Sequence, residues 1–371
     1  MNKKLIALAV AGAVFAPAAL AQTPANAVTV YGLVDMTLEN VKADAGPAAG
    51  SSISSRNRVT SQASRLGVRG TEDLGDGLKA FFQLESQVNP DDACGQGGNP
   101  NPGTLPNGGC SITGNGGKAL ASRNSAVGLQ GGFGSILLGR WDTPYKLASL
   151  SVDPWGDVTI GGYVTVMHDK GNFDRRENNA VQFWTAKYSG FEMRLHYSAN
   201  EAKATANPST ASLSATYAMD AFSVAYAYEK HSDQNGGAAL VNTTETGNEL
   251  AATYKMGPIK LGLATEKIKK TNLTDKKAWF LSGEYTMGKA TVALSYGESK
   301  DGAASTAVTQ PNTKSTVLGV KYALSGRTTA YGLYSQVKNN NAGNNDFGLN
   351  GITPATGGDP KGFGVGIKHT F

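Results

Sequence analysis

Apolar and polar residues alternate along most of this chain with a period of two. In the last ten residues Phe363, Val365, Ile367 and Phe371 share one parity, and the residues between them are small or polar. This period predicts a β-strand with two different faces. An exposed strand edge that ends on an aromatic residue would recruit other strands. We therefore expect this last strand to close a barrel whose apolar face meets lipid.

The same alternation predicts strands along the rest of the chain. They cover residues 28–39, 56–70, 78–85, 119–130, 135–141, 191–197, 212–219, 222–228, 249–256, 259–266, 278–286, 291–296, 317–324 and 329–336, and one more begins at Asn178. Short turns and long polar loops alternate between them, and residues 142–174 form a long loop without a clean strand. Counting segments gives about sixteen strands, an even number typical of membrane barrels.

A β-sandwich also alternates and is the main alternative. A sandwich would have similar turns at both ends, whereas here one end has short turns and the other has long loops. Tyrosines also gather near the predicted strand ends, as expected for the two membrane interfaces. These tyrosines are Tyr188, Tyr197, Tyr217, Tyr228, Tyr254, Tyr285, Tyr296 and Tyr322. We therefore predict an all-β fold: an antiparallel transmembrane β-barrel.

Composition agrees with an all-β chain and excludes other classes. The 371 residues include 47 glycines and carry a formal net charge of +5. Abundant glycine suits a protein with many tight turns. The charge is small for this length and no dense Lys/Arg stripe occurs, so we expect no nucleic-acid partner.

The N-terminus is predicted to be a signal peptide. Lys3 and Lys4 precede an apolar run that ends at Ala21 in a small-residue cleavage site. The run is too short for a membrane anchor, and no later run reaches the ~18–20 apolar residues of a helical span. We expect residues 1–21 to be removed and residues 22–371 to form the barrel.

Two cysteines, Cys94 and Cys110, lie in a segment rich in glycine, proline and asparagine. In an oxidising compartment this spacing predicts a disulfide that staples a loop. A metal site at these cysteines is a poor alternative, because no histidine or second cysteine pair stands nearby. We expect no metal or cofactor.

Four motifs resemble Gram-negative general porins of the beta-proteobacterial type. They are residues 30–35 (VYGLVD), 64–80 (SRLGVRGTEDLGDGLKA), 138–144 (LGRWDTP) and 368–371 (KHTF), in the family's order. The resemblance implies a sixteen-stranded homotrimeric porin in the outer membrane whose third long loop folds into the channel. It also implies contact with lipid and lipopolysaccharide, passage of small hydrophilic solutes and ions, and recognition of Phe371 by the outer-membrane barrel assembly machinery.

The resemblance also predicts where the pore narrows. Arg65 and Arg176 match the family's wall arginines by position and share parity with inward polar residues, and Arg123 matches by motif but has the parity of outward residues. Asp153 and Asp157 resemble the acidic tip of the constriction loop. Arginines facing carboxylates across a narrow gap would create a transverse field. We expect an anion preference, because charge rings set ion selectivity.

Three other functions were considered. A barrel enzyme needs a nucleophile, a base and an orienting group together, and His168, His196, His231 and His369 are scattered with no Gly-x-Ser-x-Gly elbow, so we expect no catalytic site. A substrate-specific channel would use an aromatic slide, for which the candidates are Trp141, Trp155 and Tyr163. An adhesin would act through its surface loops, which contain no recognisable motif. Finally, glycine and alanine on the outer faces of the first and last strands are compatible with packing between subunits.

Overall fold

The computed structural model describes residues 28–46, 52–91, 120–156, 158–199, 201, 207–234, 243–271, 275–301 and 311–371. The predicted signal peptide, Cys94, Cys110 and Asp157 lie outside the described residues. Within the described ranges, no helix is long and apolar enough to cross a membrane.

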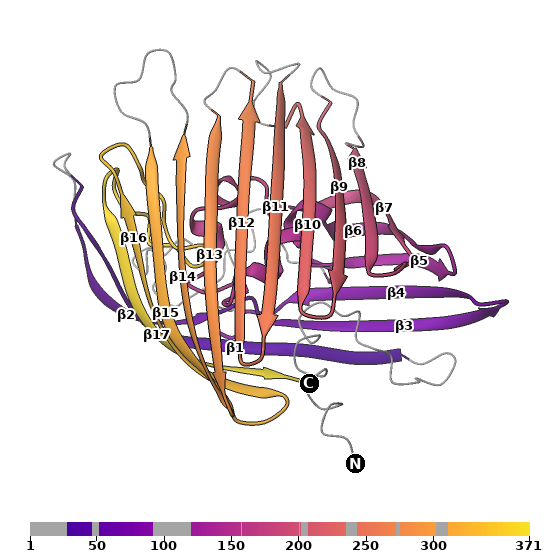
Figure 1. Cartoon of the computed structure of the whole chain (residues 1–371), viewed down its shortest axis with the longest axis horizontal. Helices are drawn as coiled ribbons and strands as arrows, with labels where there is room; N and C mark the ends of the chain where they lie inside the picture. The colour runs from indigo at the N-terminus through magenta and orange to yellow at the C-terminus, as the bar shows by residue number, and fades with distance from the viewer. Residues whose placement is uncertain are drawn as a thin grey trace, which may run out of the picture.

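The described chain is almost entirely antiparallel β-structure (Figure 1). The strands are β1 (Val28–Asp44), β2 (Ile53–Ser61), β3 (Arg65–Gly75), β4 (Leu78–Gln87), β5 (Ser125–Gly131), β6 (Gly134–Asp142), β7 (Arg176–Thr185), β8 (Phe191–Ala199), β9 (Ser209–Met219), β10 (Phe222–Ser232), β11 (Thr244–Met256), β12 (Ile259–Lys270), β13 (Lys276–Met287), β14 (Ala290–Asp301), β15 (Asn312–Ala323), β16 (Thr328–Asn339) and β17 (Asp359–Thr370). Most exceed the predicted segments by a few residues, although β5 begins at Ser125 and not at residue 119.

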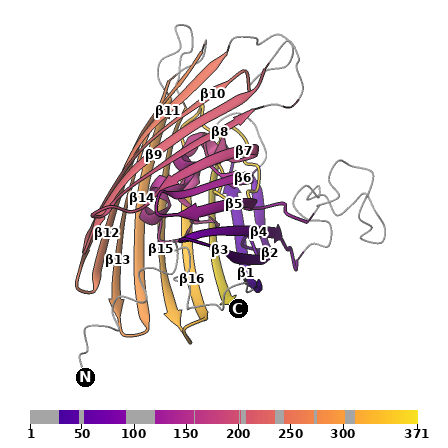
Figure 2. The ribbon, with the colours of Figure 1, turned by 90° about the vertical axis from the view of Figure 1, so that its right-hand side faces the viewer.

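The strands close into a barrel, as predicted. From β3 onward each strand pairs with the next one in the chain, and β17 returns to pair with β1 from Leu33↔Thr370 to Asp44↔Asp359. β2 and β3 both pair with β1 and are two halves of one strand, so the described chain makes a sixteen-stranded barrel. Figure 2 shows the tilt of these strands from the side. Closure leaves no open edge, which a membrane requires.

A bulge between β2 and β3 corrects the prediction of one continuous strand at residues 56–70. The register with β1 changes by one residue between Met36↔Ser61 and Leu33↔Arg65. The backbone of Ala63 is left-handed there, and the Ser64 hydroxyl accepts a hydrogen bond from the Asp35 amide at 2.9 Å. An inserted residue exchanges the two faces of a strand. Arg58 and Arg65 therefore both face the inside although their numbers differ in parity.

The outer surface of the barrel is apolar and has aromatic residues near the short turns. Half-exposed tyrosines lie two or three residues before the turn in four successive hairpins; these are Tyr217, Tyr254, Tyr285 and Tyr322. An apolar band edged by aromatic residues is the arrangement of a bilayer-spanning barrel.

The glycines of the last strand face inward, which corrects the expectation of a small-residue outer face there. Gly366 lies under the ring of Tyr331, whose Cζ would be 2.4 Å from a Cβ at that position. Phe363, Val365 and Ile367 form the outer face of β17. The glycines make room for inward side chains, so they carry no argument about subunit packing.

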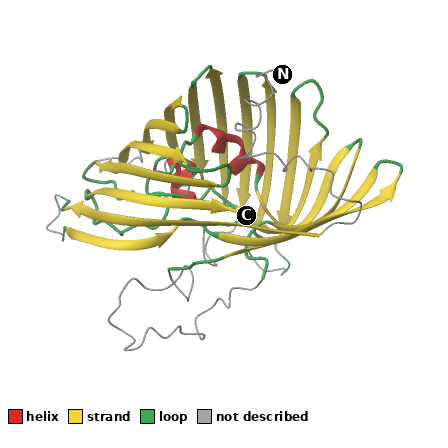
Figure 3. Ribbon diagram, turned by 90° about the horizontal axis from the view of Figure 1, so that it is seen from below, coloured by secondary structure: helices red, strands yellow, loops and turns green. Residues whose placement is uncertain are grey.

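The loop between β6 and β7 folds into the barrel, where its short helices lie inside the ring of strands (Figure 3). It contains α1 (Pro144–Ser149), η1 (Leu150–Val152), η2 (Tyr163–Thr165) and η3 (His168–Gly171). The side chain of Thr143 caps α1 by accepting from the Lys146 amide, and Pro144 occupies the first turn. α1 packs on β8 to β11 and η1 on β11 and β12. This is the predicted inward loop, residues 143–175, called the constriction loop below.

Candidate functional site

Two of the predicted arginines meet at one carboxylate on the inside of the barrel. The Nε of Arg123 lies 2.7 Å from Glu85 Oε1, and the Nε of Arg65 lies 3.7 Å from Glu85 Oε2. The hydroxyl of Tyr31 donates to the same Oε2 at 3.1 Å. Arg123 stands just before β5, where its amide donates to the Glu85 carbonyl and strand parity no longer applies. The sequence left its orientation open, and the structure turns it inward.

The third arginine belongs to a second, neighbouring cluster. The Nη2 of Arg176 lies 3.0 Å from Asp142 Oδ1, and its Nε donates to Asn124 Oδ1 at 2.7 Å. Lys146 of α1 also approaches Asp142 Oδ1, at 3.6 Å. Asn124 follows Arg123 in the chain and donates to Asp142 Oδ2 at 2.8 Å, so it joins the two clusters.

We call Arg65, Arg123, Arg176 and Lys146, with Glu85 and Asp142, the arginine wall. Four cations share these two carboxylates, but Lys146 also lies 3.0 Å from Asp174 Oδ2, so the cations exceed their carboxylate partners by one. The side chain of Arg65 is 32% exposed and those of the other cations are less so. Guanidinium groups stay charged at all relevant pH values. A fixed positive excess inside a low-dielectric barrel attracts anions.

The structure corrects the expectation that Asp153 faces the arginines. Asp153 is 6% exposed, its Oδ1 accepts from the Trp155 amide and its Oδ2 accepts from the Tyr163 amide, both at 2.9 Å. Its carboxylate therefore holds two parts of the constriction loop together. Backbone amides compete well for a loop carboxylate, and strand period says nothing about loop residues.

The three aromatic candidates for a solute slide pack the loop and wall instead. Tyr163 and Trp155 are buried in two hydrophobic clusters between the constriction loop and the barrel. Trp155 fills the space beside Gly319, where a Cβ would be 2.5 Å from its ring. Trp141 packs edge-on against Trp184. These residues position the loop and do not offer a continuous aromatic surface to solutes.

The opposite side of the constriction loop rests on buried acids and histidines. We call Glu229, Glu245, Glu249 and Glu266 of β10 to β12, with His168 and His231, the anchor wall. His231 lies 2.7 Å from Glu229 Oε1 and 3.5 Å from Glu245 Oε2, and its ring stacks on Phe173 at 4.2 Å. The ring of Phe173 from the loop thus rests on a group of paired charges that belongs to the barrel.

His168 is the loop's own contribution to this wall. Its Nε2 lies 2.7 Å from Glu249 Oε2, and its Nδ1 lies 3.8 Å from Asp174 Oδ1. Burial alone would lower the pKa of His168, but the Glu249 and Asp174 carboxylates outweigh it and raise that pKa well above the usual value. Burial likewise opposes ionisation of Asp174, but two neighbouring cations outweigh it. Lys146, whose Nζ lies 3.0 Å from Asp174 Oδ2, and His168 hold the pKa of Asp174 below the usual range. Asp174 thus pairs with a cation of each wall, Lys146 of the arginine wall and His168 of the anchor wall.

Sequence reasoning missed Glu85, Asp142, Lys146 and the four glutamates of the anchor wall. Glu85 has the inward parity of its strand, and Asp142 stands within the LGRWDTP segment, so both had a usable signal. The alternating Glu245, Glu249 and His231 also face inward. What the pattern could not show is which of these groups meet across strands.

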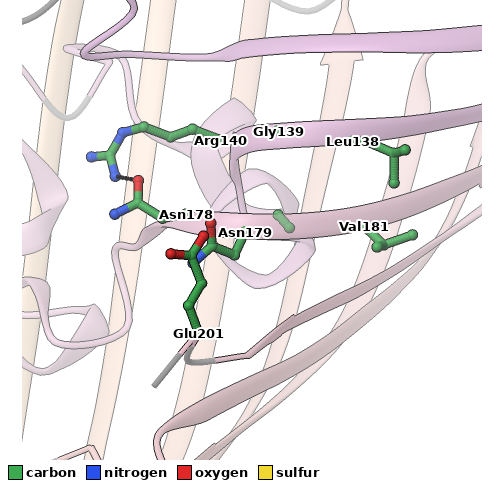
Figure 4. A pocket seen from close by; sticks show the side chains of 8 residues that line it. Leu138, Gly139, Arg140, Asn178, Asn179, Val181 and Glu201 are labelled. Atoms are coloured by element: carbon green, nitrogen blue, oxygen red, sulfur yellow. Dashed lines mark hydrogen bonds between the residues drawn. The ribbon is translucent and has the colours of Figure 1, made fainter. Parts of the chain in front are cut away.

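A separate pocket opens where the β6 and β7 pairing is interrupted (Figure 4). Arg140 donates to Asn178 Oδ1 at 2.5 Å, and Leu138 and Val181 line the other end. Both of these apolar side chains are half-exposed, like the lipid-facing residues of the same strands. This pocket therefore lies on the outside of the barrel and does not belong to the arginine wall.

Comparisons with known proteins agree with this architecture. A model of the family described as Gram-negative porin matches residues 7–342. Outer membrane porin protein 32 of Delftia acidovorans is 30% identical over 387 residues and covers 100% of both chains. An outer membrane porin protein of Bordetella pertussis is 30% identical and covers 71% of this chain and 69% of its own. The solved anion-selective porin from Comamonas acidovorans superposes with a TM-score of 0.76 at 25% identity, over 93% of this chain and 100% of that one.

Proposed function

The chain belongs to the Gram-negative porin family, and on that premise we propose that its outer-membrane channel prefers anions. It is a multi-pass outer-membrane barrel that lets small hydrophilic solutes and ions diffuse through a water-filled lumen. The preference rests on one observation above all: the four cations of the arginine wall outnumber their three carboxylate partners, Glu85, Asp142 and Asp174. The name of the similar Comamonas porin, which is called anion-selective, supports the same sign.

Reversal potential in a planar bilayer tests the proposal. Purified protein is inserted between two chambers that hold different concentrations of KCl. We expect a reversal potential whose sign shows that chloride permeates faster than potassium. A clear cation preference would contradict the proposal, whereas the channel itself would still be seen as ohmic conductance. Repeating the measurement in strong salt provides a control, because screening should reduce the preference.

We propose that the constriction loop, braced by Asp153, forms the narrow part of the lumen opposite Arg65, Arg123 and Arg176. Asp157 stays a prediction for the acidic side of this constriction. Support comes from the packing of α1 and η1 on β8 to β12, inside the barrel. Asp153→Asn should keep the sign of selectivity, since this carboxylate is turned into the loop.

We also propose that Phe371 is the assembly signal. Its amide and carbonyl both bond to Gly32 at 3.1 Å, and its ring occupies the space where a Gly32 Cβ would stand. The ring is 48% exposed on the outer face. Deleting Phe371 should reduce the amount of protein in the outer membrane well before it alters the conductance of channels that do form. Normal assembly of the deletion variant, measured in isolated outer membranes, would refute the signal.

A homotrimer is proposed from the family resemblance. Chemical cross-linking in outer membranes, followed by mass analysis in detergent, should give a species of three chains. A monomer under the same conditions would contradict it and would leave the channel proposal intact.

A further inference from the structure

A buried group of three side chains lies where the constriction loop meets the barrel. His168 of the loop, Glu249 of β11 and Glu266 of β12 each present one potential ligand atom, and these atoms lie within 4.8 Å of one another. All three residues are at most 3% exposed. The group is separate from the arginine wall and plays no part in the anion preference proposed above.

The contacts within this group leave two carboxylate oxygens unsatisfied. Glu249 Oε2 is paired with His168 Nε2 at 2.7 Å, and Glu266 Oε2 accepts from the Tyr145 hydroxyl at 3.2 Å. Glu249 Oε1 and Glu266 Oε1 are buried and have no hydrogen-bond partner among the described residues. Burying unpaired carboxylate oxygens is costly unless a cation or a donor meets them.

A proton on His168 does not satisfy the two unpaired carboxylate oxygens, because Nε2 points to only one oxygen of Glu249, the Oε2 that it already contacts. A divalent cation in place of that proton would meet one ligand atom from each of the three residues, because these atoms lie within 4.8 Å of one another. One nitrogen and two carboxylate oxygens are a donor set typical of Zn²⁺, whereas Ca²⁺ takes six to eight oxygens. We propose that His168, Glu249 and Glu266 bind a divalent cation of the Zn²⁺ class.

The surroundings of the three residues fit this assignment. Metal-bound histidines usually donate their other ring N–H to a carboxylate, which fixes the ring orientation. Asp174 Oδ1 stands 3.8 Å from His168 Nδ1 and is itself among the buried atoms without a hydrogen bond. The hydroxyl of Tyr145 likewise orients Glu266 by donating to its Oε2. Ser149 Oγ, 3.1 Å from Nε2, or a water could complete the coordination.

Such an ion would cross-link the constriction loop to the barrel. His168 belongs to the loop, whereas the two glutamates belong to neighbouring strands that pair at Glu249↔Glu266. The cation would therefore hold the loop against β11 and β12. Metal removal should loosen the loop without removing any charge from the arginine wall.

Metal content tests the proposal directly. The protein is extracted from outer membranes without a polyhistidine tag, or refolded with and without Zn²⁺, and dialysed before mass spectrometry of bound metal. We expect one Zn²⁺ per chain in the wild type and its loss in His168→Ala and in Glu266→Gln. His231→Ala and Glu245→Gln are matched controls, because they remove a buried histidine and a buried glutamate of the same wall but should keep the ion.

Refolding with Co²⁺ gives a second readout that does not need a variant to fold. The wild type should show the visible absorption of tetrahedral Co²⁺ without thiolate charge transfer, which separates this group from the two cysteines. Absence of bound metal in the wild type would overturn the proposal. Metal that persists in folded His168→Ala, or is lost equally in His231→Ala, would also overturn it, and a thiolate spectrum would move the ion to the cysteines.

Discussion

The two inner walls of this barrel carry opposite charge and differ in what they touch. The arginine wall holds more cations than carboxylates, and Arg65 remains partly exposed. The anchor wall holds four buried glutamates and two buried histidines beneath the constriction loop. Exposed fixed charge acts on ions in the lumen, whereas buried charge acts on its neighbours. One wall should therefore set which ions pass, and the other how wide the passage is.

The comparison also shows why charge alone is a poor guide to function in such a barrel. Counted by residue type, both walls are equally suited to select ions. Burial separates them, because the loop covers β8 to β12 and removes their carboxylates from water. Four predictions test this separation, from the largest expected effect to the smallest.

Removing the arginines should reverse the ion preference. The triple variant Arg65→Gln, Arg123→Gln and Arg176→Gln leaves Lys146 against Glu85, Asp142 and Asp174, so an excess of one positive charge becomes an excess of two negative charges. A fixed charge about 8 Å from a permeating ion in water changes the energy of that ion by about 0.5 kcal/mol. Three such charges therefore give about a tenfold change in the permeability ratio. Reversal potential in a KCl gradient measures it.

Its control removes three exposed cations near the short turns, namely Lys255, Lys289 and Arg327, each replaced by glutamine. The three control substitutions should change the anion preference much less, because the replaced cations lie outside the constriction and are screened by salt. An equal effect of both triple variants would show that the arginine wall has no special role.

Phe173→Ala should widen the passage without changing its sign of selectivity. The Phe173 ring is buried between Tyr145 and His231 and also lies against Gly247. Truncation of a buried phenylalanine costs about 3–5 kcal/mol, so the base of the loop should detach more easily. We expect a larger and noisier single-channel conductance. We also expect the variant in lipid vesicles to unfold at a lower urea concentration than the wild type.

Phe363→Ala, on the lipid-facing surface of β17, is the matched control and should leave the conductance unchanged. If Phe173→Ala instead altered the sign of the reversal potential, the division of roles between the two walls would be wrong.

Glu85→Gln should increase the anion preference about twofold, because it removes one negative charge beside Arg65 and Arg123. The same reversal-potential measurement applies. Glu72→Gln, an exposed acid near the short turn of β3, should have less effect. A fall in anion preference would mean that Glu85 is needed chiefly to hold the arginines in place.

Lys321→Gln should have the smallest effect. Its Nζ lies 2.6 Å from Glu284 Oε2, so its charge is already paired, and its contacts with the loop are the Pro154 carbonyl at 3.0 Å and the ring of Trp155 at 5.5 Å. We expect a loss of anion preference below about twofold, and conductance close to wild type. A larger effect than that of Glu85→Gln would place the selective charges on β15 and not on the arginine wall.

On most strands, sequence reasoning predicted both the fold and the direction of the side chains; the bulge between β2 and β3 is an exception. Arg65 was expected to face inward from its parity with polar neighbours, and it does. The direction of the Arg123 side chain could not be predicted, because Arg123 precedes β5. Its amide donates to the Glu85 carbonyl and is not part of the regular hydrogen-bond ladder of β5. Asp153 was misplaced for a related reason: two loop amides orient its carboxylate.

By itself, the sequence determined a closed barrel, the faces of its strands and the side on which the long loops lie. These follow from a period of two and from alternating turn lengths, which are local properties of the chain. The tertiary structure alone decided which charges meet. Glu85 gathers arginines from two segments, and His168 reaches Glu249 across 81 positions of the chain. Such pairs depend on how the loop packs inside the barrel, and no local pattern encodes that packing.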